Sequence, residues 1–237
     1  MANPNDVIKG EEVTLDIEPG MNILEVNKKL AQKNKELLQK HNITAIDIMG
    51  SIGAGKTSLI EKLVQKLKQK YRIVVFKGDL TTTIDAERIG KHGVQVITIN
   101  TGRECHLDAN VVARAVERIS LNDIDLLIIE NVGNLICPAE FPLGTDKRVV
   151  VISVTEGPYM ILKHPFTFMN ADAMVINKKD LAKTMNIDTN QLERQAKDVK
   201  PDIKVAVTNA LSGEGVDKLI KDCLLYTSDA ADEEDSV

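Results

Sequence analysis

The sequence predicts a three-layer α/β fold around a mainly parallel, roughly seven-stranded sheet, and three observations support this prediction. Short apolar runs alternate with helical patterns, which is typical of a parallel sheet covered by helices on both faces. The runs at 126–129 and 149–152 are almost continuous Val, Ile and Leu, as expected for buried middle strands. A glycine-rich segment at 50–57 separates one run from a helical pattern. The predicted strands are 45–49, 73–76, 94–99, 126–129, 149–154, 174–176 and 204–207.

The chain of 237 residues is expected to form one main domain over residues 21–225, flanked by two short segments. Residues 1–20 are compatible with a short edge strand around Val13, Leu15 and Ile17 or with a flexible segment. Residues 22–41 predict an amphipathic helix whose lysine-rich face is either solvated or a partner surface. Residues 226–237 are an acidic tail, expected to be disordered or a non-native remnant.

The composition restricts the class of protein. Hydrophobic residues make up 43% of the chain and charged residues 27%, and no apolar run approaches the roughly 18 residues of a membrane span. The net charge of −5 argues against a nucleic-acid partner. Three cysteines and the absence of a signal-peptide pattern fit a reducing compartment. We therefore expect a cytoplasmic protein with no membrane and no nucleic-acid partner.

Residues 50–57 fit the phosphate-loop pattern G-x-x-x-x-G-K-[ST] between a strand-like and a helix-like segment. Glycines let successive backbone amides point at phosphate oxygens, and the following helix N-terminus adds partial positive charge. Lys56 is expected to reach the β and γ phosphates, and Thr57 to bind the Mg²⁺ between them. The predicted fold is therefore that of a phosphate-loop NTPase. The loop residues expected at the nucleotide are Gly50, Ser51, Ile52, Gly53, Ala54, Gly55, Lys56, Thr57 and Ser58.

Residues 177–180 read Asn-Lys-Lys-Asp after a predicted strand, and N-K-x-D is an arrangement that reads guanine. Asp180 can accept hydrogen bonds from the ring N–H and the exocyclic amine of guanine, whereas adenine would leave it unpaired. Lys178 is expected to cover the base and Asn177 to brace the phosphate loop. Residues 208–213 follow the last strand, where a backbone amide could meet the guanine oxygen. The candidates there are Asn209, Ala210 and Leu211.

Acidic residues follow two other predicted strands. Glu130 and Gly133 have the spacing of a γ-phosphate switch, with Glu130 expected to hold the Mg²⁺ shell and Gly133 to offer an amide. Asp79 and Asp85 follow the second strand, so at least one should approach the metal or the attacking water. Asp85 could equally be a helix N-cap. The candidate catalytic residues are Lys56, Asp85 and Glu130; no glutamine stands out to position water, which predicts slow intrinsic GTP hydrolysis.

Cys105 and His106 are adjacent, and Cys137 lies 31 residues beyond His106, far from any zinc-finger spacing. Both segments follow predicted strands, so they are expected at the sheet edge where the nucleotide sits. Two thiolates and one imidazole make an open site that suits Zn²⁺ or Ni²⁺. The remaining cysteine and histidines are expected not to be ligands, namely Cys223, His41, His92 and His164.

Taken along the chain, the phosphate loop and the Glu-Cys-His, Glu-Asn-Val-Gly-Asn, Ile-Cys-Pro and Asn-Lys-Lys-Asp segments resemble the HypB family, the nickel-incorporation GTPases of hydrogenase maturation. The resemblance covers roughly residues 22–225. It implies a GTP/GDP-binding homodimer formed with GTP, metal on Cys105, His106 and Cys137 near the subunit contact, and Mg²⁺ near Thr57, Asp85 and Glu130. It further implies delivery of Ni²⁺, with a partner nickel metallochaperone, to a nickel-iron hydrogenase large-subunit precursor.

Some members of this family carry N-terminal cysteine or histidine motifs. Residues 1–41 of this chain differ, because they contain no cysteine and only one histidine, His41. Tight independent nickel storage is therefore not expected. We hypothesise that GTP orders residues 130–133, repositions Cys137 and changes metal affinity.

Three alternatives remain open at this point. The urease-type nickel GTPase places a histidine directly after Cys-Pro, whereas Ala139 follows Pro138 here. A regulatory GTP switch protein could hold a purely structural zinc. A small-molecule kinase could share the phosphate loop, although the sequence shows no acceptor-site signature.

Overall fold

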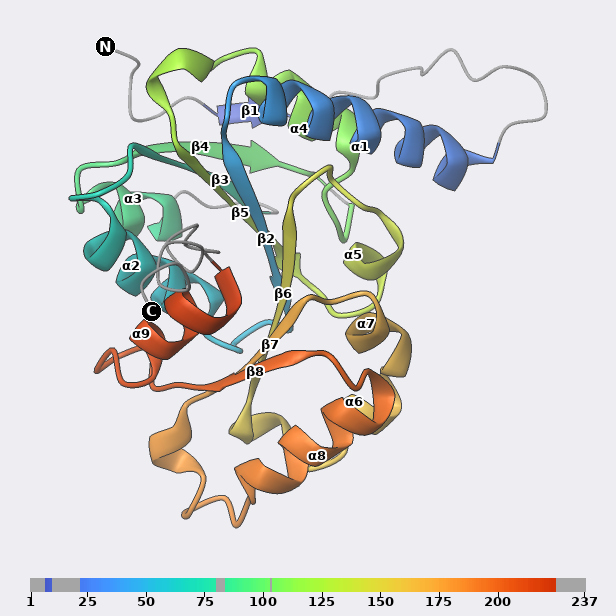
Figure 1. The fold of residues 1–237 in the computed structure, drawn as a ribbon, viewed down its shortest axis with the longest axis vertical. Coiled ribbons are helices and arrows are strands. Elements are labelled where there is room, and N and C mark those ends of the chain that lie inside the picture. The colour runs from blue at the N-terminus through green and yellow to red at the C-terminus, as the bar shows by residue number, and fades with distance from the viewer. Residues whose placement is uncertain (1–6, 10–21, 80–83, 103, 225–237) are drawn as a thin grey trace, which may run out of the picture.

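The computed structural model describes residues 7–9, 22–79, 84–102 and 104–224, and its centre is an eight-stranded, all-parallel sheet (Figure 1). The strand order is β1-β4-β3-β5-β2-β6-β7-β8, so β2, which leads into the phosphate loop, lies between β5 and β6. All seven predicted strands are confirmed, and β1 adds an edge strand. The bounds are β1 Val7–Lys9, β2 Thr44–Gly50, β3 Ile73–Asp79, β4 Gln95–Asn100, β5 Leu126–Gly133, β6 Lys147–Ser153, β7 Ala173–Asn177 and β8 Lys204–Val207.

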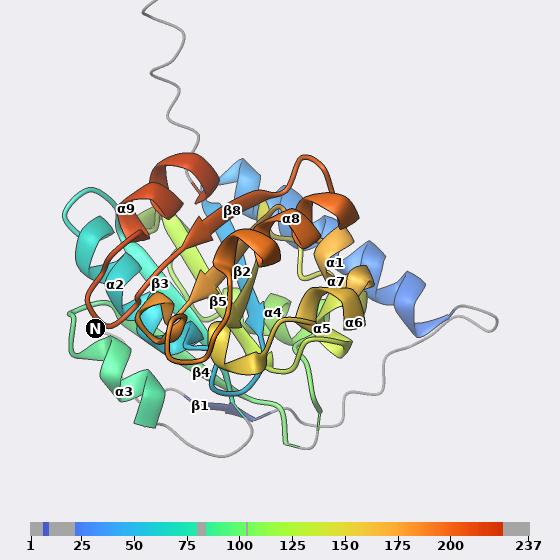
Figure 2. The same ribbon diagram turned by 90° about the horizontal axis from the view of Figure 1, so that it is seen from below.

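Helices cover both faces of the sheet, which gives the predicted three layers (Figure 2). On one face α2, α3 and α9 pack on alternate residues of the central strands, among them Ile46 and Val75. On the other face α1 and α4 cover the β3–β5 half, and α6 to α8 cover the β6–β7 half. The bounds are α1 Ile23–Lys40, α2 Lys56–Leu67, α3 Ile84–Gly90, α4 Ala109–Val116, α5 Cys137–Glu140, α6 Met160–Lys163, α7 Pro165–Met169, α8 Thr189–Val199 and α9 Val216–Leu219.

Short helical turns complete the connections. They are the 3₁₀ turns Leu121–Asp123, Val154–Glu156 and Lys179–Leu181 and a π turn at Ile220–Leu224. No helix among the described residues is long and apolar enough to cross a membrane.

The N-terminal edge strand lies at Val7–Lys9, ahead of the residues around Val13 to Ile17 that suggested a strand in the sequence. β1 pairs in parallel with β4 through Val7 to Lys9. The apolar residues that suggested a strand, Val13, Leu15 and Ile17, lie outside the described residues, as does the acidic segment 226–237.

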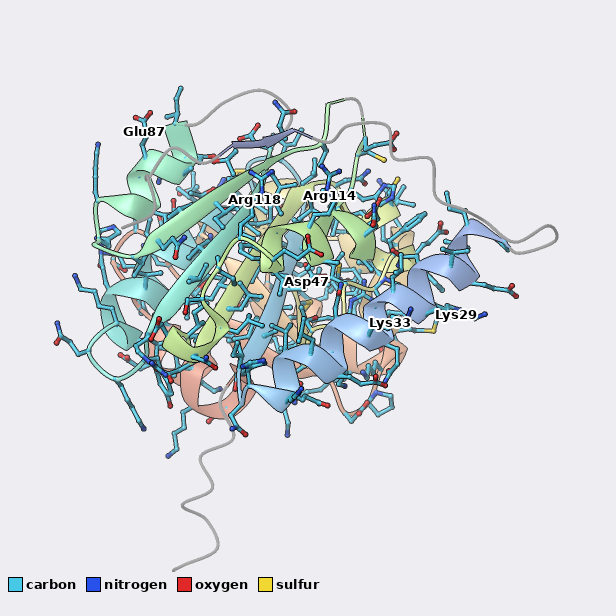
Figure 3. All side chains as sticks on the ribbon, turned by 90° about the horizontal axis from the view of Figure 1, so that it is seen from above. Lys29, Lys33, Asp47, Glu87, Arg114 and Arg118 are labelled. Atoms are coloured by element: carbon cyan, nitrogen blue, oxygen red, sulfur yellow. The ribbon has the colours of Figure 1, made fainter. Side chains whose placement is uncertain are left out.

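Helix α1 lies beside α4, as Figure 3 shows from above, and two buried asparagines fasten it there. Asn27 Oδ1 accepts from the backbone N–H of Ala109 at 2.7 Å, and its Nδ2 donates to the carbonyl of Pro142 at 2.9 Å. Asn34 Nδ2 donates to the carbonyls of Ala109 at 2.8 Å and Leu143 at 3.1 Å. Because buried amides must be paired, these bonds fix α1 to the start of α4 and to the segment after α5.

Candidate functional site

The phosphate loop curls around the N-terminus of α2. Gly55 adopts φ +95° at the N-terminus of α2, a conformation that glycine reaches without strain. The Lys56 ammonium donates to the carbonyls of Gly50 at 2.9 Å and Ser51 at 3.0 Å. Burial lowers the pKa of Lys56, against the opposing charge of Glu130. The loop therefore holds its lysine on its own carbonyls.

A cavity of about 500 Å³ lies over this loop at the carboxyl ends of β3 and β5. In open parallel sheets, this end of the strands is where ligands bind. A larger cavity of about 810 Å³ lies at the start of β3 and β4 and contains no predicted site residue. Ten predicted site residues line the smaller cavity: Ile52, Gly53, Gly55, Lys56, Thr57, Ser58, Asp85, Glu130, Gly133 and Lys178.

Thr57 joins the two carboxylates that the sequence assigned to magnesium. Its hydroxyl lies 2.8 Å from Glu130 Oε1 and 3.3 Å from Asp85 Oδ2. Asp85 lies inside α3, in its first turn, so the alternative of Asp85 as an N-cap is wrong. Instead, its Oδ1 accepts from Arg88 at 2.9 Å, which fixes the carboxylate toward the cavity.

Lys77 is a site residue that sequence reasoning missed. Its ammonium is buried and lies 3.0 Å from Glu130 Oε1, 3.9 Å from Asp79 Oδ2 and 4.0 Å from Asp85 Oδ2. The only available signal was a lysine directly after four apolar residues of strand β3, in Ile-Val-Val-Phe-Lys-Gly-Asp. Lys77 therefore balances the carboxylates that face the cavity.

The oxygen atoms around Thr57 fit a magnesium ion. Glu130 is almost fully buried, and its Oε2 has no hydrogen-bond partner among the described residues. A buried carboxylate oxygen without a partner is costly unless a cation completes it. Hydroxyl and carboxylate oxygens are the ligands that Mg²⁺ prefers. These residues are therefore suited to hold Mg²⁺ together with nucleotide phosphates.

Replacing Lys77 with methionine is expected to destabilise the protein by about 3 kcal/mol without added Mg²⁺, because the buried Glu130 loses its paired charge. Urea unfolding would measure the change, and Mg²⁺ should stabilise Lys77→Met more than the parent. Lys66→Met is the matched control, since the Lys66–Asp217 pair is exposed and its loss should cost less than about 1 kcal/mol. Equal losses for both variants would contradict the charge-balancing role.

Asn177 connects three loops around the predicted base site. Its Nδ2 donates to the carbonyl of Ala54 at 2.9 Å, so it does brace the phosphate loop. Its Oδ1 accepts from Thr208 Oγ1 at 3.1 Å and from the backbone N–H of Ala210 at 3.0 Å. Lys178 follows in the left-handed conformation at φ +59°, and Asp180 is exposed in the next turn. Asp180 is therefore an exposed carboxylate on a loop that Asn177 ties to the phosphate loop.

Cys105, His106 and Cys137 form a compact group despite their separation in sequence. Their ligand atoms all lie within 4.8 Å of one another, and it is the one group of this kind found in the described part of the chain. Cys105 and His106 lie between β4 and α4, and Cys137 begins α5 after β5. Both cysteines are free thiols, which are half-buried like the imidazole.

The chemistry of this group suits a soft or borderline cation. The neighbouring thiol of Cys137 raises the pKa of Cys105, while burial lowers the pKa of His106 and favours the neutral imidazole that binds metals. The His106 ring packs on Phe141 with centroids 3.9 Å apart. Two thiols and an imidazole fit Zn²⁺ or Ni²⁺ with at least one coordination position left open.

The metal-type group and the nucleotide cavity share one end of the sheet. The phosphate loop follows β2, the Cys105–His106 segment follows β4, and Cys137 follows β5, all at the carboxyl ends of parallel strands. Leu107, next to His106, donates its N–H to Asn131 Oδ1 at 3.1 Å, and Asn131 adjoins Glu130. A single strand, β5, thus contacts both regions.

A second buried carboxylate, Asp47, lies on β2 under the layer formed by α1 and α4 (Figure 3). Burial raises its pKa to about 6, although the Arg148 charge and a hydrogen bond from Asn131 act in the opposite direction. Ionising Asp47 is therefore harder in the folded protein than in the unfolded chain.

The sign of the resulting pH dependence follows from linkage. The folded pKa is raised, so the contribution of Asp47 to stability is complete below about pH 4 and is lost as the pH rises to about 6. Ionisation of Asp47 should lower the free energy of unfolding of the parent by about 3 kcal/mol at neutral pH, and Asp47→Asn should not show this loss. The stability of the variant relative to the parent should therefore increase from about pH 4.5 to about pH 7.5. Urea unfolding across this range would measure it. A flat or falling difference would mean that Arg148 dominates.

The parallel sheet, the glycine-rich loop with its buried lysine and the following helix define a phosphate-loop nucleotide-binding protein. The model of the CobW/HypB/UreG nucleotide-binding domain matches residues 44–207. The probable hydrogenase maturation factor HypB of Methanocaldococcus jannaschii is 53% identical over 199 residues, which cover 84% of this chain and 90% of that protein. The chain therefore belongs to the HypB branch of the CobW/HypB/UreG family.

Two solved structures agree with this assignment. The hydrogenase maturation factor HypB of Archaeoglobus fulgidus has a TM-score of 0.78 and 41% identity, with 83% of this chain and 96% of that chain covered. HypB of Helicobacter pylori, solved in complex with nickel, has a TM-score of 0.77 and 34% identity, with coverage of 82% and 91%.

Proposed function

We propose that this chain is a metal-binding GTPase that supplies nickel during the maturation of nickel-iron hydrogenase. The observation that carries the proposal is the convergence of Cys105, His106 and Cys137 on loops that follow β4 and β5, while β5 also presents Glu130 to the nucleotide cavity. The family relatives named as hydrogenase maturation factors, one solved with nickel, support the same role. Ni²⁺ is the cargo in this proposal, and Zn²⁺ is a second occupant of the same ligands.

The nucleotide site is proposed to bind GTP and GDP. The loop amides and Lys56 would hold the phosphates, while Asn177, Lys178 and Asp180 would surround guanine, with the 209–211 backbone at its oxygen. Thr57, Asp85 and Glu130 would hold Mg²⁺, which neutralises charge on the β and γ phosphates. Hydrolysis is expected to be slow, because no glutamine in the sequence stands out to position water.

The coupling between the two sites is proposed to pass through the end of β5. Gly133 lines the nucleotide cavity, and Cys137 follows only four residues later. Ordering of residues 130–133 by the γ phosphate would move Cys137 and change metal affinity. In this scheme GTP also favours a homodimer. A partner nickel metallochaperone donates the nickel, and the hydrogenase large-subunit precursor receives it. The free thiols of Cys105 and Cys137 agree with the expected reducing cytoplasm.

The test compares the parent, Cys137→Ala and His164→Ala by titration with Ni²⁺ and Zn²⁺ in the presence of GDP or a non-hydrolysable GTP analogue. We expect Cys137→Ala to weaken metal binding by about 100-fold or more while GDP affinity stays within about twofold, because a thiolate ligand is lost and Cys137 does not line the nucleotide cavity. His164→Ala, outside the cluster, should match the parent. Light scattering would report the oligomeric state in the same samples.

Two outcomes would contradict the proposal. Unchanged metal affinity in Cys137→Ala would contradict the assignment of the metal site to Cys105, His106 and Cys137. Equal metal affinity with GDP and with the GTP analogue would contradict the coupling, and would favour the regulatory switch with a structural zinc.

A further inference from the structure

The two parts of the metal-type group are held from the inside of the molecule by buried polar side chains. We call residues 105–109 the first arm and residues 137–140 the second arm. The first arm is fastened by Asn131, whose Oδ1 accepts from the Leu107 N–H at 3.1 Å. Asn131 is fully buried, and the same oxygen accepts from the N–H of Val132 at 3.0 Å. The backbone next to His106 is therefore fixed to β5.

The second arm is fastened by Arg148, which lies on β6. Its Nη2 donates to the carbonyl of Pro138 at 2.6 Å, and its Nη1 donates to the carbonyl of Ala139 at 3.3 Å. These carbonyls belong to the two residues directly after Cys137. The guanidinium can contact both because its donors form a rigid planar fork.

Asp47 joins these two fastening points across the centre of the sheet. Its Oδ1 accepts from Asn131 Nδ2 at 3.2 Å, and its Oδ2 lies 3.8 Å from Arg148 Nε. Asp47 is fully buried on β2, which lies between β5 and β6 in the sheet. Its Oδ2 and Arg148 Nε have no hydrogen-bond partner in the described part of the chain, so an ion pair alone links them.

Such a group is expensive to bury, because each ion loses its hydration and the pair lacks an ideal hydrogen bond. An apolar trio of similar volume would often stabilise the core as well or better. A functional role for these three side chains therefore explains the arrangement better than a contribution to stability does. Partners behind metal ligands commonly fix ligand orientation, and their loss weakens metal binding.

We propose that Asp47, Asn131 and Arg148 form a clamp that positions both arms of the metal site. The inference rests on the proposed function, because it assumes that Cys105, His106 and Cys137 bind the metal. Asn131 adjoins Glu130, the carboxylate proposed to hold Mg²⁺. The clamp therefore also links the position of both arms to the position of β5. The three are positioning residues, because Asn131 and Arg148 contact the backbone of the arms and Asp47 contacts Asn131.

Arg148→Lys is the decisive variant, since lysine keeps a positive charge opposite Asp47 but cannot reach both carbonyls. We expect its Zn²⁺ affinity, measured by competition with a chromogenic chelator, to fall about 10-fold while GDP affinity stays within about twofold. The thiolate charge-transfer absorption of the Co²⁺-loaded protein should also shift. Asn131→Leu, which releases the first arm, should weaken Zn²⁺ to a similar degree.

Gln195→Leu is the matched control, because Gln195 is a buried amide on α8, outside the clamp, and its loss should leave Zn²⁺ affinity within about twofold. Parental Zn²⁺ affinity and an unchanged Co²⁺ spectrum in folded Arg148→Lys would overturn the clamp. If Asn131→Leu does not fold, Arg148→Lys decides alone.

Cys137→Ala separates this inference from the proposed function. If Cys137→Ala binds Zn²⁺ as tightly as the parent, the metal site itself is wrong and the clamp fails with it. If Cys137→Ala loses Zn²⁺ while Arg148→Lys retains parental affinity and spectrum, the metal site stands and the clamp alone fails.

Discussion

Gly50→Ala is expected to lower the free energy of unfolding by about 3 kcal/mol or more and to abolish GDP binding. A Cβ on Gly50 would lie 2.2 Å from the backbone oxygen of Val151 on β6, and the residue has φ +154°. Since the obstacle is backbone in the middle of the sheet, neither side can yield cheaply. The displaced loop would lose the Gly50 carbonyl that holds Lys56. Urea unfolding and GDP titration would measure both effects.

Gly93→Ala is the matched control for the backbone term. Gly93 has φ +81°, and a Cβ there meets no atom within 4 Å. Its substitution should cost about 1–2 kcal/mol from the left-handed conformation alone and leave GDP affinity unchanged. Equal costs for Gly50→Ala and Gly93→Ala would show that the close approach to β6 does not matter.

Asp180→Asn is expected to weaken GDP binding by about 100-fold or more, because two hydrogen bonds to a charged carboxylate are lost or reversed. Asp180 is exposed, so the stability of the nucleotide-free protein should not change. The asparagine amide can donate where the aspartate accepted, so xanthine nucleotides should bind the variant better than the parent. Isothermal titration with GDP, XDP and ADP would measure the three affinities.

Two results would contradict this base assignment. GDP affinity within about threefold of the parent would place the base elsewhere, since the expected loss is far larger. A parallel loss of GDP, XDP and ADP would indicate that the loop held by Asn177 had changed shape, rather than that a base contact had been removed.

Local patterns were sufficient to predict the strands and the phosphate loop. The phosphate loop depends on eight consecutive residues, and each of the seven strands depends on its own apolar run, so no distant residue was needed. The Asn177 contact with the phosphate loop was also predictable, because both segments end strands at the same edge. The edge strand at Val7–Lys9 was not placed, because three residues carry too little pattern.

Other parts of the site depend on the order of strands in space. Lys77 reads as a lysine directly after four apolar residues, and its role depends on β3 lying next to β5, where Glu130 is. The contact of Arg148 and Asn131 with Asp47 requires β2 between β5 and β6, although their positions in sequence give no sign of it.

The sequence by itself determined the family of folds, the phosphate loop, the predicted guanine-reading segment and the identity of the three candidate metal ligands. Tertiary structure alone decided that Cys105 and His106 meet Cys137, that Lys77 balances the carboxylates, and that Asp47 lies between Asn131 and Arg148. The physical reason is that hydrogen bonds and turns within a short segment are fixed by neighbouring residues. Contacts between segments depend instead on which strands become neighbours when the whole core is buried.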